Sequence, residues 1–309
     1  MESRYDREMR ILRFKSGRNL HLGLWDGASV VDLTALDKSV FHSLNTLVST
    51  ASKRHLGIDE VIAKMLSDGD NRLKRLEMKE NNHGSSLELV IPVSPPEVWC
   101  CGVTYRRSQE ARETETSVKG IYDQVYNAAR PEVFFKGTAR HCVGPVGDIG
   151  IRGDSKWSVP EPELAFVLGS EGKIIGFTGG NDVSSRDIEG ENPLYLTQAK
   201  TFTGSCALGP SIVTLDEVGP EPKLGIECEV YRTGKSVFKG STSTSLMKRS
   251  VQELRSYLLR YNPVPLGSVC LTGTGLVPPD DFSLEEGDIV EVKVEKIGAL
   301  KNRVRRLQA

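Results

Sequence analysis

Apolar and polar residues alternate near the start of the chain, which is the pattern of short β-strands. Residues 9–14 (MRILRF) and 20–25 (LHLGLW) flank the turn-forming pair Ser16-Gly17, so this stretch predicts a β-hairpin. Further on, the apolar spacing becomes helical, and one face of the helix predicted from residue 58 carries Ile58, Val61, Ile62 and Met65. We therefore expect a small N-terminal α+β domain over residues 1–90.

Beyond residue 90 the chain is a succession of short apolar runs separated by glycine turns. Such a density of short strands is typical of a β-rich barrel, roll or sandwich, and we expect one catalytic domain over residues 91–309. Two helical segments interrupt the strands. The one near residue 251 has an apolar stripe and predicts an ordinary packing helix.

The other helical segment, at about residues 106–129, is charged and carries little core pattern. It is too polar for a core helix and too long for a tight turn. We interpret it as a helical lid insertion over a site, with a solvated excursion of no function as the alternative.

The charge balance narrows the class of partner. The chain has 40 basic and 41 acidic residues, so no excess charge favours nucleic acid or an anionic membrane surface. The first residues are charged, and no run of about 18 apolar residues follows. We expect a cytoplasmic protein that acts on a small molecule, with no nucleic-acid or membrane partner.

Three acids, Glu161, Glu163 and Asp182, predict a metal site. In a strand, residues 161 and 163 point to one face and lie about 6 to 7 Å apart. If Glu171-Gly172 forms a two-residue hairpin loop, Asp182 lies opposite Glu161. Carboxylates this close repel unless a proton, a basic group or a cation intervenes, and an all-oxygen set favours Mg²⁺, Mn²⁺ or Ca²⁺. From spacing alone, exposed acids on a solvated strand face remain the alternative.

Four runs in order resemble the fumarylacetoacetate hydrolase superfamily: PEVFFKG, EPELAFVLGSEGKIIGFTGGNDVSSRD, QAKTFTGSCALGPSIV and LTGTG. The resemblance covers about residues 97–294. It implies a mixed β-sandwich roll behind a small N-terminal α+β domain, and Mg²⁺ or Mn²⁺ held by the three acids. It also implies a 2-oxo acid substrate that chelates the metal, and a homodimer or homotetramer.

One position departs from the hydrolytic members of that superfamily. They carry a water-activating histidine three residues after the tyrosine of a G-x-N-Y-x-x-H motif, and here Ser108 stands in its place after Tyr105. The phrases RPEVFFKG, RGDSKWSVPEPEL and ENPLYLTQAK resemble the sugar-acid dehydratase branch instead. This likeness implies a metal-dependent dehydratase that converts a 2-keto-3-deoxy sugar acid, of the arabinonate or xylonate type, to 2,5-dioxopentanoate.

Two other readings stay open. One is different metal-dependent 2-oxo acid chemistry of the superfamily, namely acylpyruvate hydrolysis, oxaloacetate decarboxylation or tautomerisation. The other is a metal-binding homologue without activity that serves as an interaction protein.

Two residues are catalytic candidates, and the resemblance assigns the first of them. Lys200 matches the metal-proximal lysine of the family, and a cation beside a divalent ion is expected to have a lowered pKa and to act as base or enolate stabiliser. Glu132 is the candidate for the second proton transfer, as a partly desolvated acid that stays protonated near neutral pH. An ion pair of Glu132 with Arg130 or Lys136 is the alternative.

The remaining candidates concern substrate binding and support of the site. Thr272, Gly273 and Thr274 can form a small nest of backbone N–H groups for a substrate carboxylate, although a plain glycine turn would look the same. Lys136 is assigned to the substrate site as well, where it fits a supporting contact to the metal-binding carboxylates.

Overall fold

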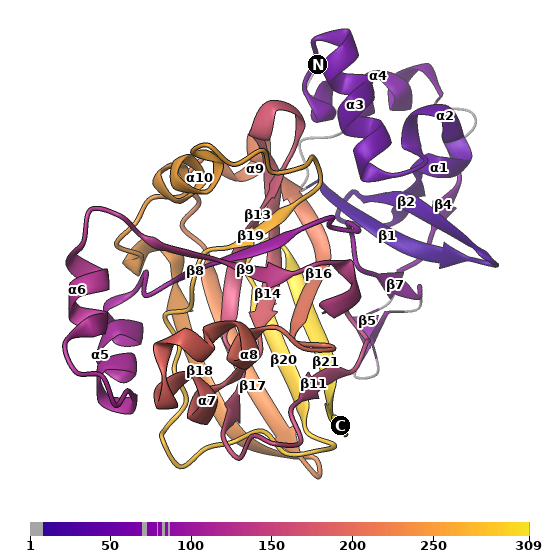
Figure 1. Cartoon of the computed structure of the whole chain (residues 1–309). Coiled ribbons are helices and arrows are strands. Elements are labelled where there is room, and N and C mark those ends of the chain that lie inside the picture. The colour runs from indigo at the N-terminus through magenta and orange to yellow at the C-terminus, as the bar shows by residue number, and fades with distance from the viewer. Residues whose placement is uncertain (1–8, 70–72, 79, 82–83, 86, 309) are drawn as a thin grey trace.

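Two β-sheets pack against each other in the computed structural model, which describes residues 9–69, 73–78, 80–81, 84–85 and 87–308 (Figure 1). The larger sheet has ten strands along its main path, in the spatial order β4 (Arg75–Leu76), β3 (Val30–Asp32), β2 (Asn19–Trp25), β1 (Arg10–Ser16), β16 (Cys206–Thr214), β14 (Ile174–Asp182), β13 (Pro162–Leu168), β19 (Val269–Leu271), β8 (Val98–Gly102) and β9 (Glu132–Gly137). Two short strands branch from this path: β7 (Leu89–Val90) pairs with β1, and β10 (Cys142–Val143) pairs with β16.

The second sheet has the order β11 (Ile149–Ile151), β21 (Gly298–Arg306), β20 (Ile289–Val294), β17 (Gly225–Arg232) and β18 (Lys235–Ser243). Two small ribbons pair β12 (Ser158–Val159) with β15 (Ser184–Ser185), and β5 (Glu80–Asn81) with β6 (Gly84–Ser85). Short 3₁₀ turns occur at η2 (Ala139–His141), η3 (Ser170–Gly172), η4 (Pro193–Tyr195) and η5 (Thr244–Leu246).

Strand β13 is buried on both faces and divides the core in two. Leu164 and Phe166 pack into the cluster between the sheets, whereas Ala165 and Val167 pack into a second cluster on the other face. This alternation follows from the two-residue period of a strand. By the same period Glu163 lies on the same face of β13 as Ala165 and Val167. A carboxylate therefore lies next to apolar side chains on this face.

The N-terminal helices cover that second face. They are α1 (Leu33–Leu36), α2 (Lys38–Phe41), α3 (Leu44–Arg54) and α4 (Ile58–Asp68). The predicted apolar face of α4 is confirmed, since Ile58, Val61 and Ile62 lie in the second cluster. Strand β1 pairs with β16, so one sheet continues across the expected division near residue 90, and the two-domain division stays a prediction.

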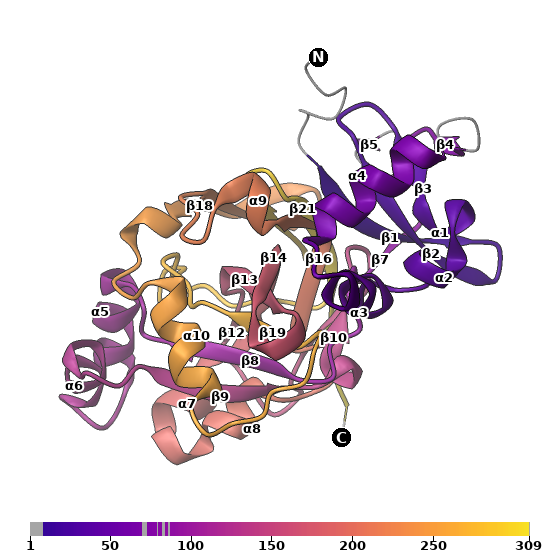
Figure 2. The same ribbon diagram turned by 90° about the horizontal axis from the view of Figure 1, so that it is seen from above.

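The remaining helices follow beyond residue 90: α5 (Arg106–Glu115), α6 (Ile121–Asn127), α7 (Arg186–Glu191), α8 (Leu196–Lys200), α9 (Leu215–Val218) and α10 (Val251–Leu259). Helices α5 and α6, which form the predicted lid, lie on the side of the molecule away from α3 and α4 (Figures 1 and 2). Val251, Leu254 and Leu258 of α10 are buried between the sheets, as its stripe predicts. The expected α+β, β-rich fold class is confirmed.

The hairpin of β13 and β14 has the predicted register, although its loop is longer than expected. Glu163 pairs with Gly180, but the turn at η3 contains three residues instead of two, and a bulge after Val167 restores the register. Within the described part of the chain, the structure contains no helix that combines the length and apolarity of a membrane span.

Candidate active site

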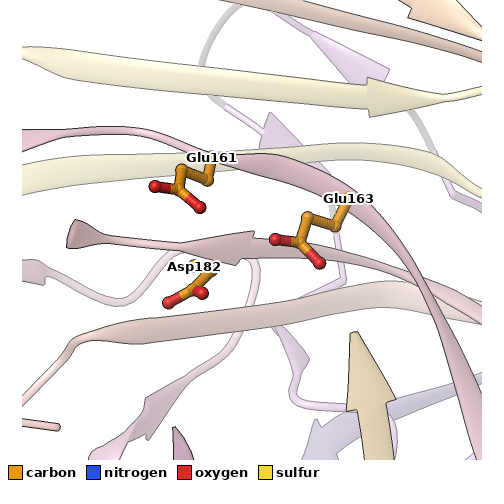
Figure 3. Close-up of side chains that lie close together, drawn as sticks. All are labelled: Glu161, Glu163 and Asp182. Atoms are coloured by element: carbon orange, nitrogen blue, oxygen red, sulfur yellow. The ribbon is translucent and has the colours of Figure 1, made fainter. Parts of the chain in front are cut away.

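The three predicted metal ligands converge at one end of the β13–β14 hairpin (Figure 3). Glu161 directly precedes β13, Asp182 ends β14, and the amide of Asp182 donates to the carbonyl of Glu161 at 2.9 Å. One carboxylate oxygen of each acid, with Glu163 as the third, lies within 4.8 Å of the other two. At most 6% of each residue is exposed, so the alternative of solvated surface acids is wrong.

Burial and mutual repulsion make this group costly without a cation. The pKa of Glu163 lies well above its ordinary value because of burial first, and then because of the negative charges of Asp182 and Glu161. The amide of Gly273 donates to Glu163 Oε2 at 2.5 Å and partly offsets this. Three converging carboxylates with this excess of charge fit a hard divalent ion such as Mg²⁺.

Two buried lysines flank the carboxylates. Lys200 Nζ lies 3.0 Å from Glu161 Oε2 and 3.3 Å from Asp182 Oδ2. Lys136, which is fully buried, pairs with the other oxygen of Asp182 and donates to the carbonyl of Val183. The predicted support of the carboxylates by Lys136 therefore agrees with its contacts, while a contact with substrate stays a prediction.

The pKa expected for Lys200 differs from the one this structure supports. Burial by itself lowers the pKa of Lys200, but the negative charges of Asp182, Glu161 and Glu189 raise it well above its ordinary value. The sequence-based expectation of a lowered pKa assumed a divalent ion beside the amine. The carboxylates alone hold Lys200 protonated, since each favours the charged amine.

Helix α5 of the predicted lid supplies two residues that the sequence did not single out. Arg112 of α5 is 5% exposed, and its Nη2 lies 3.4 Å from Glu161 Oε1. Glu115, at the end of the same helix, accepts two hydrogen bonds of 2.7 and 2.6 Å from Arg186 Nη1. Arg186 in turn donates from Nε to Glu161 at 3.2 Å. Helix α5 is thus linked to Glu161, a predicted metal ligand, through Arg112 and Arg186.

A small cavity lies beside the carboxylates. Its lining combines lid, strand and helix residues, among them Ser108, Glu132, Glu189, Lys200 and Thr274. Ser108 therefore borders the cavity at the position where the resemblance expects a histidine in hydrolytic relatives.

Glu132 has the environment of a proton donor. Burial, followed by the charge of Glu189, raises the pKa of Glu132 to about 7. A side-chain carbon on Gly102 would lie 2.0 Å from Glu132 Oε2, so only glycine leaves room for this carboxyl. Among the described residues Glu132 makes no ion pair with Arg130 or Lys136, and its role in proton transfer stays a prediction.

The predicted nest of residues 272–274 is partly engaged within the protein. The hydroxyl of Thr272 donates to the carbonyl of Leu164 at 2.8 Å, and the Gly273 amide serves Glu163 as described. Thr274 and Gly273 line the cavity, whereas Thr272 is not among the lining residues. Substrate binding by these residues stays a prediction, and the placement favours Thr274 over Thr272.

Comparisons with known proteins agree with this site. Residues 97–305 match the model of the fumarylacetoacetate (FAA) hydrolase C-terminal family. A probable 2-keto-3-deoxyxylonate dehydratase of Haloferax volcanii is 43% identical over 277 residues, which cover 90% of this chain and 92% of the relative. A 2-dehydro-3-deoxy-D-arabinonate dehydratase of Saccharolobus solfataricus is 41% identical over 283 residues, with coverage of 89% and 93%.

Among solved structures, that of a 2-keto-3-deoxy-D-arabinonate dehydratase complexed with magnesium and 2,5-dioxopentanoate is similar, with a TM-score of 0.79 and 34% identity. The similarity covers 97% of this chain and 100% of that one. The magnesium of that complex accords with the carboxylate group described above.

Proposed function

The chain belongs to the fumarylacetoacetate hydrolase family, and from this membership we propose that it is a magnesium-dependent dehydratase of 2-keto-3-deoxy sugar acids. The substrate is of the arabinonate or xylonate type and the product is 2,5-dioxopentanoate. The observation that carries the proposal is the convergence of Glu161, Glu163 and Asp182 beside a cavity. Relatives above 40% identity that bear dehydratase names support the reaction class.

A magnesium ion bound by the three carboxylates would polarise the C2 carbonyl of the substrate and acidify the adjacent C3 protons. In the proposed reaction a C3–H bond and the C4–O bond break, and the C4 hydroxyl leaves as water. Breaking these two bonds leaves a C3=C4 double bond beside the C2 carbonyl and a hydroxyl on C5. A proton then moves from C5 to C3 to give the C4–C5 enol, which tautomerises to the 5-aldehyde, so water is the only other product.

Two residues of this chain are proposed to carry the protons and the charge. Lys200, held within 3.3 Å of two ligand carboxylates, lies where a cation would stabilise the developing enolate or, once a divalent ion lowers its pKa, accept the C3 proton. Glu132, with a pKa of about 7, is matched to donate a proton to the leaving hydroxyl near neutral pH.

Alternative chemistry on the same metal remains the second candidate. Acylpyruvate hydrolysis requires a base that activates water, and Ser108 at the cavity wall cannot serve as one at neutral pH. Oxaloacetate decarboxylation or tautomerisation needs no such base, so these reactions are the ones to compare with dehydration.

We also propose a cytoplasmic location and a homodimeric or homotetrameric state. Large apolar side chains stand exposed in the single chain, and contact with a second copy would cover residues such as Leu194, Leu246 and Tyr261.

The direct test is consumption of 2-keto-3-deoxypentonate by the purified protein with Mg²⁺ and after treatment with a chelator. We expect metal-dependent turnover, with the aldehyde product detected through a semialdehyde dehydrogenase and NAD⁺. Turnover of oxaloacetate or an acylpyruvate, with the sugar acid untouched, would replace the dehydratase by another 2-oxo acid activity on the same metal site.

A further inference from the structure

Glu189 is a buried carboxylate of the cavity wall to which the proposed reaction gives no role. It lies on α7, is 6% exposed and lines the same cavity as Glu132 and Lys200. It does not belong to the group of three carboxylates that could hold the metal. A buried acid of this kind carries a cost unless something binds to it.

One oxygen of Glu189 lacks a hydrogen-bond partner. Among the described residues, no donor reaches Glu189 Oε2, although this atom is shielded from solvent. The nearest basic atoms are Arg112 Nη1 and Lys200 Nζ, each at 3.9 Å. That distance supports charge attraction but exceeds a hydrogen bond, so the lone pairs of this oxygen remain available to a ligand in the cavity.

The surrounding charges keep Glu189 ionised. Burial by itself raises its pKa, but the positive charges of Lys200 and Arg112 outweigh that effect and lower it. The charge of Glu189 in turn raises the pKa of Glu132. Below about pH 7 the cavity therefore presents one protonated carboxyl group, that of Glu132, as a donor, and one ionised carboxylate that only accepts hydrogen bonds.

We propose that Glu189 Oε2 accepts a hydrogen bond from a hydroxyl on the substrate chain beyond C3, and thereby selects hydroxylated 2-oxo acids. This inference rests on the proposed function, which it deepens by naming a specificity residue. An ionised carboxylate leaves no favourable partner for the methylene or carbonyl groups that acylpyruvates and simple 2-oxo acids bring to the same place.

Binding to the magnesium-loaded protein tests this inference apart from turnover. The probes are 5-hydroxy-2-oxopentanoate and 2-oxopentanoate, which differ in a single hydroxyl and carry none on C4 to eliminate. Their dissociation constants are measured by calorimetry for the parent protein, for Glu189→Gln and for Glu191→Gln. Glu191 is exposed on the same helix and provides the matched control. The kcat and KM for 2-keto-3-deoxypentonate are measured in parallel.

We expect Glu189→Gln to weaken binding of the hydroxylated probe about 10- to 100-fold, the usual strength of a hydrogen bond to a charged group. Binding of 2-oxopentanoate and of Mg²⁺ should change by less than about threefold, and Glu191→Gln should match the parent. Glu189→Ala removes the acceptor altogether and should weaken binding of the hydroxylated probe at least as much as Glu189→Gln does. An unchanged Mg²⁺ affinity shows that each variant is folded.

The outcomes separate the two claims. If the probe pair is unaffected, a rise in KM for the sugar acid at unchanged kcat assigns the hydrogen bond to the C4 hydroxyl and supports the inference. A loss confined to kcat overturns it, because the charge of Glu189 acts on the pKa of Glu132 and explains such a loss without a hydrogen bond to substrate. Equal losses for both probes, or no loss for any hydroxylated ligand, overturn it. Failure of the parent protein to turn over the sugar acid refutes the proposed function, while discrimination between the probes by Glu189 would still support the inference.

Discussion

Carboxylates gather in two places in this molecule, and the two groups are built differently. Glu161, Glu163 and Asp182 lie at the end of the β13–β14 hairpin. Asp59 of α4 and Asp216 of α9 meet instead where the N-terminal helices contact the catalytic region, along one groove. In both groups burial and neighbouring acids raise a carboxyl pKa, to well above the ordinary value for Glu163 and to about 6 for Asp59.

The difference lies in what surrounds the acids. Around the first group the cationic side chains contact the carboxylate oxygens: Lys136, Lys200, Arg112 and Arg186. At the second group, within the part of the chain described, no ion pair reaches Asp59 or Asp216. Below about pH 6 a proton relieves the two acids at the groove. The three carboxylates of the first group converge beside a cavity and are arranged so that they could hold a divalent ion. Proximity of acids alone is therefore a poor criterion for a metal site.

The largest expected effect comes from breaking the first group. Glu163→Gln removes one ligand charge and keeps the shape of the side chain, so we expect Mg²⁺-dependent turnover to fall at least about 100-fold, because even residues outside the ligand shell cost 10- to 100-fold. The rise in melting temperature on adding Mg²⁺ should also be smaller in this variant than in the parent. Asp59→Asn serves as the control, and it should keep the parental Mg²⁺-dependent turnover and the parental rise in melting temperature on adding Mg²⁺. Parental turnover together with a parental Mg²⁺ shift in Glu163→Gln would refute the ligand assignment.

Next in size is the loss of a flanking cation. Lys136→Met leaves Asp182 buried beside two other acids, with Lys200 at 3.3 Å as its remaining cation. Removal of one partner of a buried ion pair typically costs about 3 to 5 kcal/mol of unfolding free energy. We expect a clearly lower melting temperature without metal, and a larger stabilisation by Mg²⁺ than in the parent, because the ion then compensates the unpaired charge.

An exposed ion pair offers the matched comparison for that experiment. Lys173 pairs with Glu171 at 3.0 Å, and about three quarters of each side chain is exposed. Lys173→Met should change the unfolding free energy by no more than about 0.5 kcal/mol. If Lys136→Met changes the unfolding free energy as little as Lys173→Met does, the cations around the first group do not stabilise it.

Much of the first group could be predicted from the sequence because its geometry is local. The two-residue strand period places Glu161 and Glu163 on one face, and a hairpin with a short loop brings Asp182 opposite. The loop is one residue longer than expected, and the bulge after Val167 compensates. The register survives because the apolar alternation along β13 fixes which residues face each core.

The lid contacts and the second group could not be predicted in this way. Arg112 and Glu189 meet the site from different helices, and only tertiary packing brings those helices together. A polar helix carrying an Arg-x-x-Glu pair was the one available signal for Arg112 and Glu115. In the sequence, Asp59 is an ordinary acid in the first turn of α4. No pattern in the residues around it predicts a contact with Asp216.

The smallest expected effect concerns that second group and its dependence on pH. Burial and the charge of Asp216 raise the pKa of Asp59 from an ordinary 3.8 to about 6. The folded protein therefore binds a proton at Asp59 more tightly than the unfolded chain between about pH 4 and pH 6. Across that window the contribution of Asp59 to stability falls as the pH rises, and above pH 6 the penalty is complete. A shift of about two pKa units corresponds to at most about 3 kcal/mol.

Asp59→Asn should therefore stabilise the protein by about 1 to 3 kcal/mol at pH 7.5, by roughly half as much at pH 5, and not at all near pH 4. Urea denaturation of variant and parent at each pH measures the difference, so other titrating groups cancel. Glu227→Gln, at an exposed position, should stay within about 0.5 kcal/mol throughout. A variant less stable than the parent at pH 7.5 would mean that the ionised Asp59 is held by favourable contacts such as the N-terminus of α4. The second group would then resemble the first, in that its carboxylates are held by positive charge rather than by a proton.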